Sequence, residues 1–172
     1  MLIRFAKVVL VLQIGIFAML VGIDNIIDYN SNFEFVRHVL SMDTTFPGNA
    51  LMDRAITDPD LHHLAYAIII ASEIITGILC IAGAIWMVRH ISATSARFQR
   101  AKSLAICGLT LGFTLWFLGF LTIGGEWFQM WQSEKWNGQQ AAFRFIACIG
   151  VVLVILLLPD GNRPTANSEE DT

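Results

Sequence analysis

The chain has 172 residues, of which 55% are hydrophobic and 15% are charged, and its formal net charge is −3. Soluble domains have roughly 45–50% apolar and about 25% charged residues, so this composition excludes an ordinary soluble domain. The weak negative charge also excludes a basic surface for nucleic acid. The hydrophobic residues fall into four blocks, each close to the roughly 20 residues with which an α-helix spans the bilayer. The sequence therefore predicts one all-α membrane domain over residues 1–158, a bundle of four transmembrane helices with short amphipathic helices in the outer loops.

The first predicted transmembrane helix covers residues 5–27, with Arg4 and Lys7 at its front edge. A basic start before an apolar run is also typical of a secretory signal peptide. This run is long and no small-residue cleavage site follows it, so we interpret it as an uncleaved signal-anchor helix.

The first outer loop, residues 24–63, is about forty residues long, too long for a simple connector. The stretch SNFEFVRHVLS places Ser31 three residues before Glu34, which is the spacing of a capping box. Its apolar residues recur at helical intervals. We expect a short amphipathic helix here, lying on the membrane surface or over the mouth of the bundle. A turn is predicted at residues 46–49 and a second short helix at 51–56.

The second predicted helix covers residues 59–88 and begins at Asp58-Pro59, an N-cap acceptor followed by a proline suited to the first turn. Glu73 lies about fourteen residues into it, close to the bilayer midplane. A carboxyl group there is expected to face the bundle interior and to be paired or protonated. It is either a proton or cation site for transport or a neutral acid that holds helices together. The candidate hydrogen-bond partners are Gln13, which lies at a similar depth, Thr76, Thr110, Thr114 and backbone carbonyls.

The third and fourth predicted helices cover residues 103–123 and 142–158. Gly108 and Gly112 have the Gly-x-x-x-Gly spacing of a close helix contact, either within the chain or between copies. Pro159 ends the fourth helix. Residues 159–172 are polar and acidic, which predicts a disordered cytoplasmic tail.

The basic residues divide unequally between the two sides of the predicted bundle. Seven lie on the side of the termini and four on the other: Arg4, Lys7, Arg89, Arg97, Arg100, Lys102 and Arg163 against Arg37, Arg54, Lys135 and Arg144. The positive-inside rule therefore places both termini and the short loop 89–102 in the cytoplasm. Loops 24–63 and 124–143 then face outward.

The segment GGEWFQMWQSEKWNGQ, residues 124–139, places three tryptophans within ten residues at the predicted outer interface. Trp127 and Trp131 are four apart, so a helical turn would put them on one face. One interpretation is an aromatic belt with polar turns. The other is a cradle for a ligand or partner, facing the first outer loop. The candidate binding residues are Glu126, Trp127, Trp131, Trp136, Asn137 and Gln139, with His38 and Asp43 from the first outer loop.

No motif in the sequence indicates a particular chemistry. It contains no catalytic-triad order, phosphate loop, dinucleotide fingerprint or zinc-binding Cys/His spacing. Adjacent His62 and His63 would point about 100° apart on a helix, which disfavours a shared metal ion. We therefore assign no catalytic residue, metal or cofactor. A membrane enzyme acting on a lipid at the outer leaflet is the least favoured interpretation.

Two segments, NSNFEFVRHVLSMDTTFP and IGGEWFQMWQSEKWNGQQAAFRF, resemble the signature regions of the domain-of-unknown-function 2165 family of predicted small integral membrane proteins. The resemblance extends to about Leu158 and implies a four-helix protein of a bacterial inner membrane. It implies no activity, and no catalytic or binding residue carries over from it.

These observations favour a non-enzymatic accessory or interaction protein whose aromatic, acidic outer face engages a partner or ligand. The alternative is a small transporter or channel that uses Glu73 as a proton or cation site. The expected partners are the lipid bilayer and either a membrane protein or further copies of the chain.

Overall fold

The computed structural model describes residues 1–160, and these form helices joined by short turns, without a strand. The long helical segments are α1 (Leu2–Ile27), α3 (Pro59–Arg89), α5 (Ser103–Thr114) with η2 (Leu115–Trp127), and α6 (Gln139–Leu157). The short ones are α2 (Tyr29–Ser41), η1 (Met52–Arg54), α4 (Ser95–Ala101) and η3 (Met130–Gln132). Four continuous helical stretches are long and apolar enough to cross a membrane, so the predicted fold class is confirmed.

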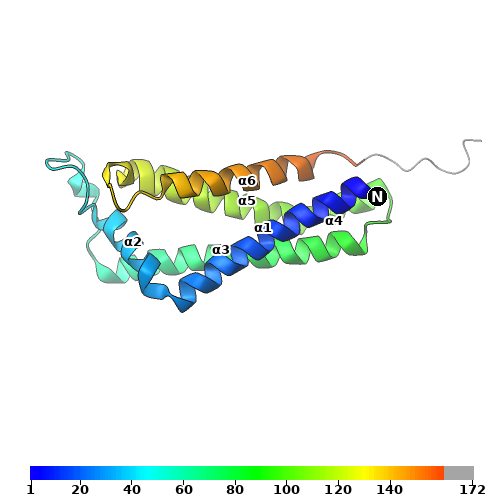
Figure 1. The fold of residues 1–172 in the computed structure, drawn as a ribbon, viewed down its shortest axis with the longest axis horizontal. Coiled ribbons are helices and arrows are strands. Elements are labelled where there is room, and N and C mark those ends of the chain that lie inside the picture. Colours follow the sequence, from blue (N-terminus) through cyan, green and yellow to red (C-terminus); the bar gives the residue numbers. More distant parts are fainter. Residues whose placement is uncertain (161–172) are drawn as a thin grey trace, which may run out of the picture.

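The long helices run side by side between two different ends (Figure 1). One end, called the terminal end below, carries the N-terminus, α4 and the last described residue, Asp160. The other, called the loop end, carries α2, η1 and η3. The predicted disordered tail falls largely on residues 161–172, which lie outside the described residues.

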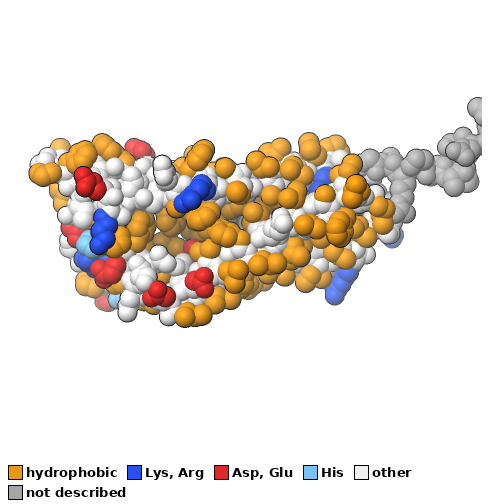
Figure 2. All heavy atoms as spheres, in the orientation of Figure 1, with side chains coloured by type: hydrophobic (Ala, Val, Ile, Leu, Met, Phe, Trp, Pro, Cys, Tyr) orange, Lys and Arg blue, Asp and Glu red, His pale blue; other side chains and the backbone are white. Residues whose placement is uncertain are grey.

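Large apolar side chains are exposed along all four spans, for example Ile16, Ile78, Phe117 and Val154. They cover the middle of the visible face in Figure 2, and the acidic side chains of that face gather toward the loop end. An apolar belt around the long helices is the surface that lipid hydrocarbon requires.

Glycines set the close packing of the long helices. A Cβ atom on Gly77 of α3 would lie 2.9 Å from the backbone nitrogen of Met19 in α1. On the other side of α3, a Cβ on Gly108 of α5 would lie 2.8 Å from the Cys80 sulfur. A Cβ on Gly112 would lie 2.9 Å from Cγ2 of Thr76. The Gly-x-x-x-Gly pattern therefore forms a contact within the chain.

Local signals are partly confirmed. The Asp58 side chain accepts a hydrogen bond from the Asp60 backbone nitrogen (2.9 Å), so the predicted N-cap of α3 is correct. The predicted amphipathic helix is also present. The prediction of a capping box is wrong, because α2 begins at Tyr29 and Ser31 is therefore not its N-cap. Ser31 lies in its first turn and donates to Asp28 (2.6 Å), while Glu34 pairs with Arg37.

The third span changes its hydrogen-bonding pattern half-way. From Leu115 to Trp127 it is π-helical, as in the bond from the Phe128 nitrogen to the Ile123 carbonyl (3.0 Å). π-Helix is rare, and its usual form, a single turn within an α-helix, is frequently found at functional sites. This segment lines both cavities of the loop end described below.

A cluster of buried charges closes the terminal end. Lys7 Nζ lies 3.1 Å from one carboxylate oxygen of Asp160, and Lys102 pairs with the other. Arg4 donates to the carbonyl of Ala93 (2.6 Å), which ties the α3–α4 connection to α1. Arg4, Lys7 and Lys102, whose predicted role was only to set the orientation in the membrane, therefore also hold the helix ends together.

Candidate functional site

A polar cavity of about 400 Å³ opens at the loop end, between α1, α2, α3, η2 and α6. The visible face is hollowed between α1 and α6 near this end (Figure 2). Glu73 lies among the lining residues, as do Trp136 and Asn137 from the tryptophan segment. The fold therefore brings the membrane-embedded carboxyl and part of the predicted outer cradle to one cavity.

Glu73 is the deepest polar group of this cavity, and its side chain is only 2% exposed. Asn25 Nδ2 donates to Glu73 Oε2 (2.7 Å), and Asn32 Nδ2 donates to Asn25 Oδ1 (2.6 Å). The Tyr66 hydroxyl fixes the same turn by donating to the Asn25 carbonyl (3.2 Å). A chain of hydrogen bonds thus leads from Asn32 in α2 down to the carboxyl group.

The predicted pairing of Glu73 with Gln13 is wrong. Gln13 is exposed on α1, and it is displaced from Asn25 by about 120° around the helix, at about 100° per residue. Thr110 and Thr114 are exposed as well, while the buried Thr76 hydroxyl has no hydrogen bond within residues 1–160.

The level of Glu73 within the bundle differs with the helix against which it is measured. The first turns of α3 extend beyond the end of α1, where Tyr66 contacts Asn25 and His63 stacks on Phe33 of α2 (4.2 Å). Glu73 itself packs beside Gly22, in the last third of α1. The carboxyl group therefore lies level with the last third of α1 but close to the middle of α3, and its position near the bilayer midplane stays a prediction.

We expect Asn25→Leu to lower the free energy of unfolding by about 1–3 kcal/mol, because it leaves the buried Glu73 carboxyl without its donor. The matched control is Gln13→Leu, which removes an exposed amide from the apolar face of the same helix. Its expected effect is close to zero or stabilising. Thermal unfolding of the protein in detergent measures both, and equal losses would contradict the assignment of Asn25.

The three tryptophans do not share one face. Gln129 adopts a left-handed conformation (φ 55°) and breaks the helix between Trp127 and Trp131. Trp127 lies under the Arg54 guanidinium (4.5 Å), and Trp131 meets Phe46 edge-on (5.8 Å). Each ring therefore packs against the first outer loop, but at a separate point.

Trp136 stands at the rim of the polar cavity. It stacks on His38 (4.6 Å between ring centres), and His38 Nδ1 lies 2.8 Å from Asp43 Oδ1. Lys135, which the sequence analysis did not select, also lines the cavity and places its Nζ 4.6 Å from the Trp136 ring. Its position became apparent only from the path of the loop.

A charged pair on α2 lies beside this rim. Arg37 hydrogen-bonds to Glu34 (2.8 Å), which lowers the pKa of Glu34 and raises that of Arg37. Both groups are therefore charged at neutral pH. Within residues 1–160 no three His, Cys, Asp or Glu side chains converge as a metal site would require.

The remaining predicted residues have different positions. Asn137 Oδ1 accepts from the Gln139 backbone nitrogen (3.1 Å), so this pair forms the turn into α6. Glu126 is exposed and does not line the polar cavity. The geometry therefore unites Glu73, Trp136, Asn137 and, by stacking, His38, but leaves Glu126, Trp127 and Trp131 outside this cavity.

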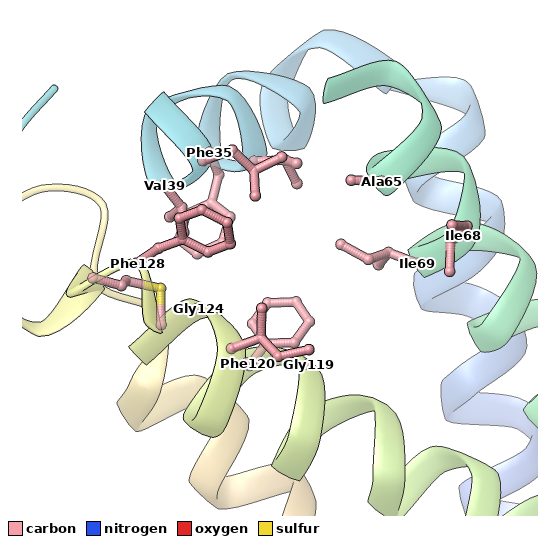
Figure 3. Close-up of a pocket in the computed structure, with 13 residues that line it drawn as sticks. Phe35, Val39, Ala65, Ile68, Ile69, Gly119, Phe120, Gly124 and Phe128 are labelled. Carbon is pink, nitrogen blue, oxygen red and sulfur yellow. The ribbon is translucent and has the colours of Figure 1, made fainter. Parts of the chain in front are cut away.

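A second cavity, of about 220 Å³ and almost wholly apolar, lies on the other side of a thin wall. Its side chains come from α2, α3, η2 and the residues Phe128 and Met130 that follow η2, and they point into one space (Figure 3). Phe35, Val36, Ile69 and Phe120 line both cavities and form the wall between them.

Comparison with known proteins gives the family. The family model described as "Predicted small integral membrane protein (DUF2165)" matches residues 3–159. The chain belongs to the DUF2165 family. No curated protein and no solved structure matches it.

In this DUF2165 member, the two cavities lie a side chain apart, and only one of them carries hydrogen-bonding groups among its apolar lining. The polar one presents hydrogen-bonding groups at its floor and an aromatic rim, and the apolar one presents only hydrocarbon and aromatic rings. Such a pair suits a molecule with a polar part and an apolar part.

Proposed function

We propose that this integral membrane protein is a non-enzymatic accessory protein that binds an amphipathic molecule at its loop end. The observation that carries the proposal is the shared wall of Phe35, Val36, Ile69 and Phe120. Because these four residues border both cavities, a ligand lying across them would place its polar part toward Glu73 and its apolar part between α3 and η2.

The sizes and linings support a lipid-like ligand. Ligand cavities are typically about 300–1,000 Å³ and are mostly apolar, with a few placed polar groups. The two cavities measure about 400 and 220 Å³, so the apolar one reaches this range only together with the polar one. Ile68, which lines the apolar cavity, is 57% exposed on the lipid-facing side of α3. A molecule in the bilayer can therefore reach this cavity sideways.

The orientation we propose is that of a bacterial inner-membrane protein with cytoplasmic termini. Arg89, Arg97 and Arg100 are exposed at the terminal end, whereas the acidic side chains visible in Figure 2 lie toward the loop end. This asymmetry supports the positive-inside assignment. The ligand site then opens toward the outer leaflet.

Transport of protons or cations through Glu73 is the second candidate, favoured by the hydrogen-bond chain from Asn32 to the carboxyl group. The packing below the cavity stands against it. Trp116, Thr76, Cys80 and Leu109 are all buried between Glu73 and the terminal end, and the glycine contacts leave no room between α3 and α5. A transporter would show pH-dependent flux in proteoliposomes that Glu73→Gln abolishes, whereas we expect no such flux.

The test is photo-crosslinking in proteoliposomes with a phosphatidylethanolamine that carries a diazirine on one acyl chain. We expect labelling to concentrate on the peptides around Ile69 and Phe120. Gly119→Leu should reduce this labelling severalfold, because Gly119 lines the apolar cavity and its Cβ has no neighbour closer than 3.8 Å.

The matched control is Ala71→Leu, which enlarges an exposed residue of α3 that lines neither cavity. Labelling spread evenly over all four spans, and unchanged by Gly119→Leu, would refute the ligand site. Purification in mild detergent with mass spectrometry then tests the other use of the loop end, as the contact surface for a stoichiometric protein partner.

A further inference from the structure

A third cavity lies at the opposite, terminal end of the molecule. It measures about 510 Å³ and is formed where the last turn of α3 meets α4. Three arginines line it, Arg89 from α3 and Arg97 and Arg100 from α4, together with Trp86 and His90. It shares no residue with the two cavities of the loop end.

The positive charge of this cavity has no counter-charge in the part of the chain that the structure describes. No carboxylate there forms an ion pair with any of the three arginines. Asp160, the acid at this end, is occupied by Lys7 and Lys102. Three exposed guanidinium groups around one hollow therefore attract an anion.

The position of the cavity along α3 places it at the membrane surface. Ile85 and Val88, directly before Arg89, are each 49% exposed and belong to the apolar belt. Trp86, which is 45% exposed, contacts the His90 ring at a tilt (4.7 Å between ring centres), and His90 Nδ1 donates to the Trp86 carbonyl (2.9 Å). Tryptophan is enriched at the level of the lipid headgroups.

We propose that this arginine cavity binds the phosphate of an anionic membrane phospholipid. Guanidinium groups bind phosphate oxygens through paired N–H donors, which a lysine cannot reproduce. Basic cavities between transmembrane helices at the membrane surface are suited to anionic headgroups. Free phosphate has the same chemistry, but only a lipid also contacts the apolar surface of α3, where the exposed Ile85 lies one turn before Arg89.

The test is native mass spectrometry of the full chain in detergent, with phosphatidylglycerol and phosphatidylcholine of identical acyl chains added in turn. We expect phosphatidylglycerol to bind several-fold more tightly. Arg97→Gln and Arg100→Gln should each weaken its binding about fivefold. Arg97→Lys should recover only part of this loss, because the charge remains while the paired donors do not.

The matched control is Arg144→Gln, which removes an exposed arginine of α6 that lines none of these cavities. It should leave phosphatidylglycerol binding unchanged. Equal binding of the two lipids, or an equal loss with Arg144→Gln, would overturn the proposal. Displacement of phosphatidylglycerol by inorganic phosphate at equal concentration would also overturn it, since it would show that the cavity recognises the free ion.

Discussion

Asp160→Ala should lower the free energy of unfolding by about 3–5 kcal/mol, because it leaves buried positive charge without its partner. The Asp160 carboxylate accepts from Lys7 Nζ (3.1 Å) and pairs with Lys102, and these two lysine side chains are 2% and 1% exposed. Loss of the carboxylate would loosen the contact between α1, α5 and the end of α6. Thermal or chemical unfolding of the purified protein in detergent measures the effect.

The control is Asp53→Ala, which removes an exposed acid that has no ion pair among residues 1–160. It should change stability by less than about 0.5 kcal/mol. Equal destabilisation by the two substitutions would show that the cluster contributes nothing beyond general charge.

The same cluster has a defined pH dependence. Burial on its own raises the pKa of Asp160, but the hydrogen bonds from Lys102 and Lys7 hold that pKa below its ordinary value of 3.8. A carboxyl group whose pKa is lowered by folding stabilises the protein above its unfolded pKa. The advantage of wild type over Asp160→Ala should therefore persist at neutral pH and disappear as the pH falls through the lowered pKa.

Gly83→Ala is expected to cost about 1–3 kcal/mol, the range found for overpacked cores. Its Cβ would lie 2.5 Å from the backbone nitrogen and 2.8 Å from the Cα of Ala105, so either α3 or α5 must move. In an unobstructed helix the same change stabilises by roughly 0.5–1 kcal/mol. The packing between α3 and α5 therefore decides whether Gly83→Ala raises or lowers the free energy of unfolding.

Gly150→Ala is the matched control in α6, since its Cβ would meet Phe113 at 3.5 Å, an ordinary contact. It should be neutral or stabilising in the same unfolding experiment. If both substitutions raised the melting temperature, the close approach of α3 and α5 at Gly83 would be wrong.

Properties that depend on neighbouring residues were predictable from the sequence. The four apolar blocks, the Asp58-Pro59 start of α3 and the amphipathic α2 are local, because run length, capping and helical periodicity act over a few residues. Glu73 and Trp136 could also be selected as candidates, since a carboxyl group inside an apolar run and an interfacial ring are unusual in any fold.

The partners of these residues could not be predicted, because partnership depends on how far each helix extends and how it is rotated about its axis. Depth alone favoured Gln13 for Glu73, but rotation turns Gln13 outward and places Asn25 against the carboxyl group. Trp127 and Trp131 separate because one left-handed residue, Gln129, interrupts the helix.

The sequence by itself determined that this chain crosses a membrane with four helices, since the hydrophobic length of a segment is a property of that segment alone. Only the tertiary structure decided which residues contact one another. It buried Lys7 and Lys102 against Asp160, although these lysines lie 153 and 58 residues before it in the chain. It also formed the two cavities of the loop end from helices distant in sequence, because a cavity exists only where packed side chains leave space between elements.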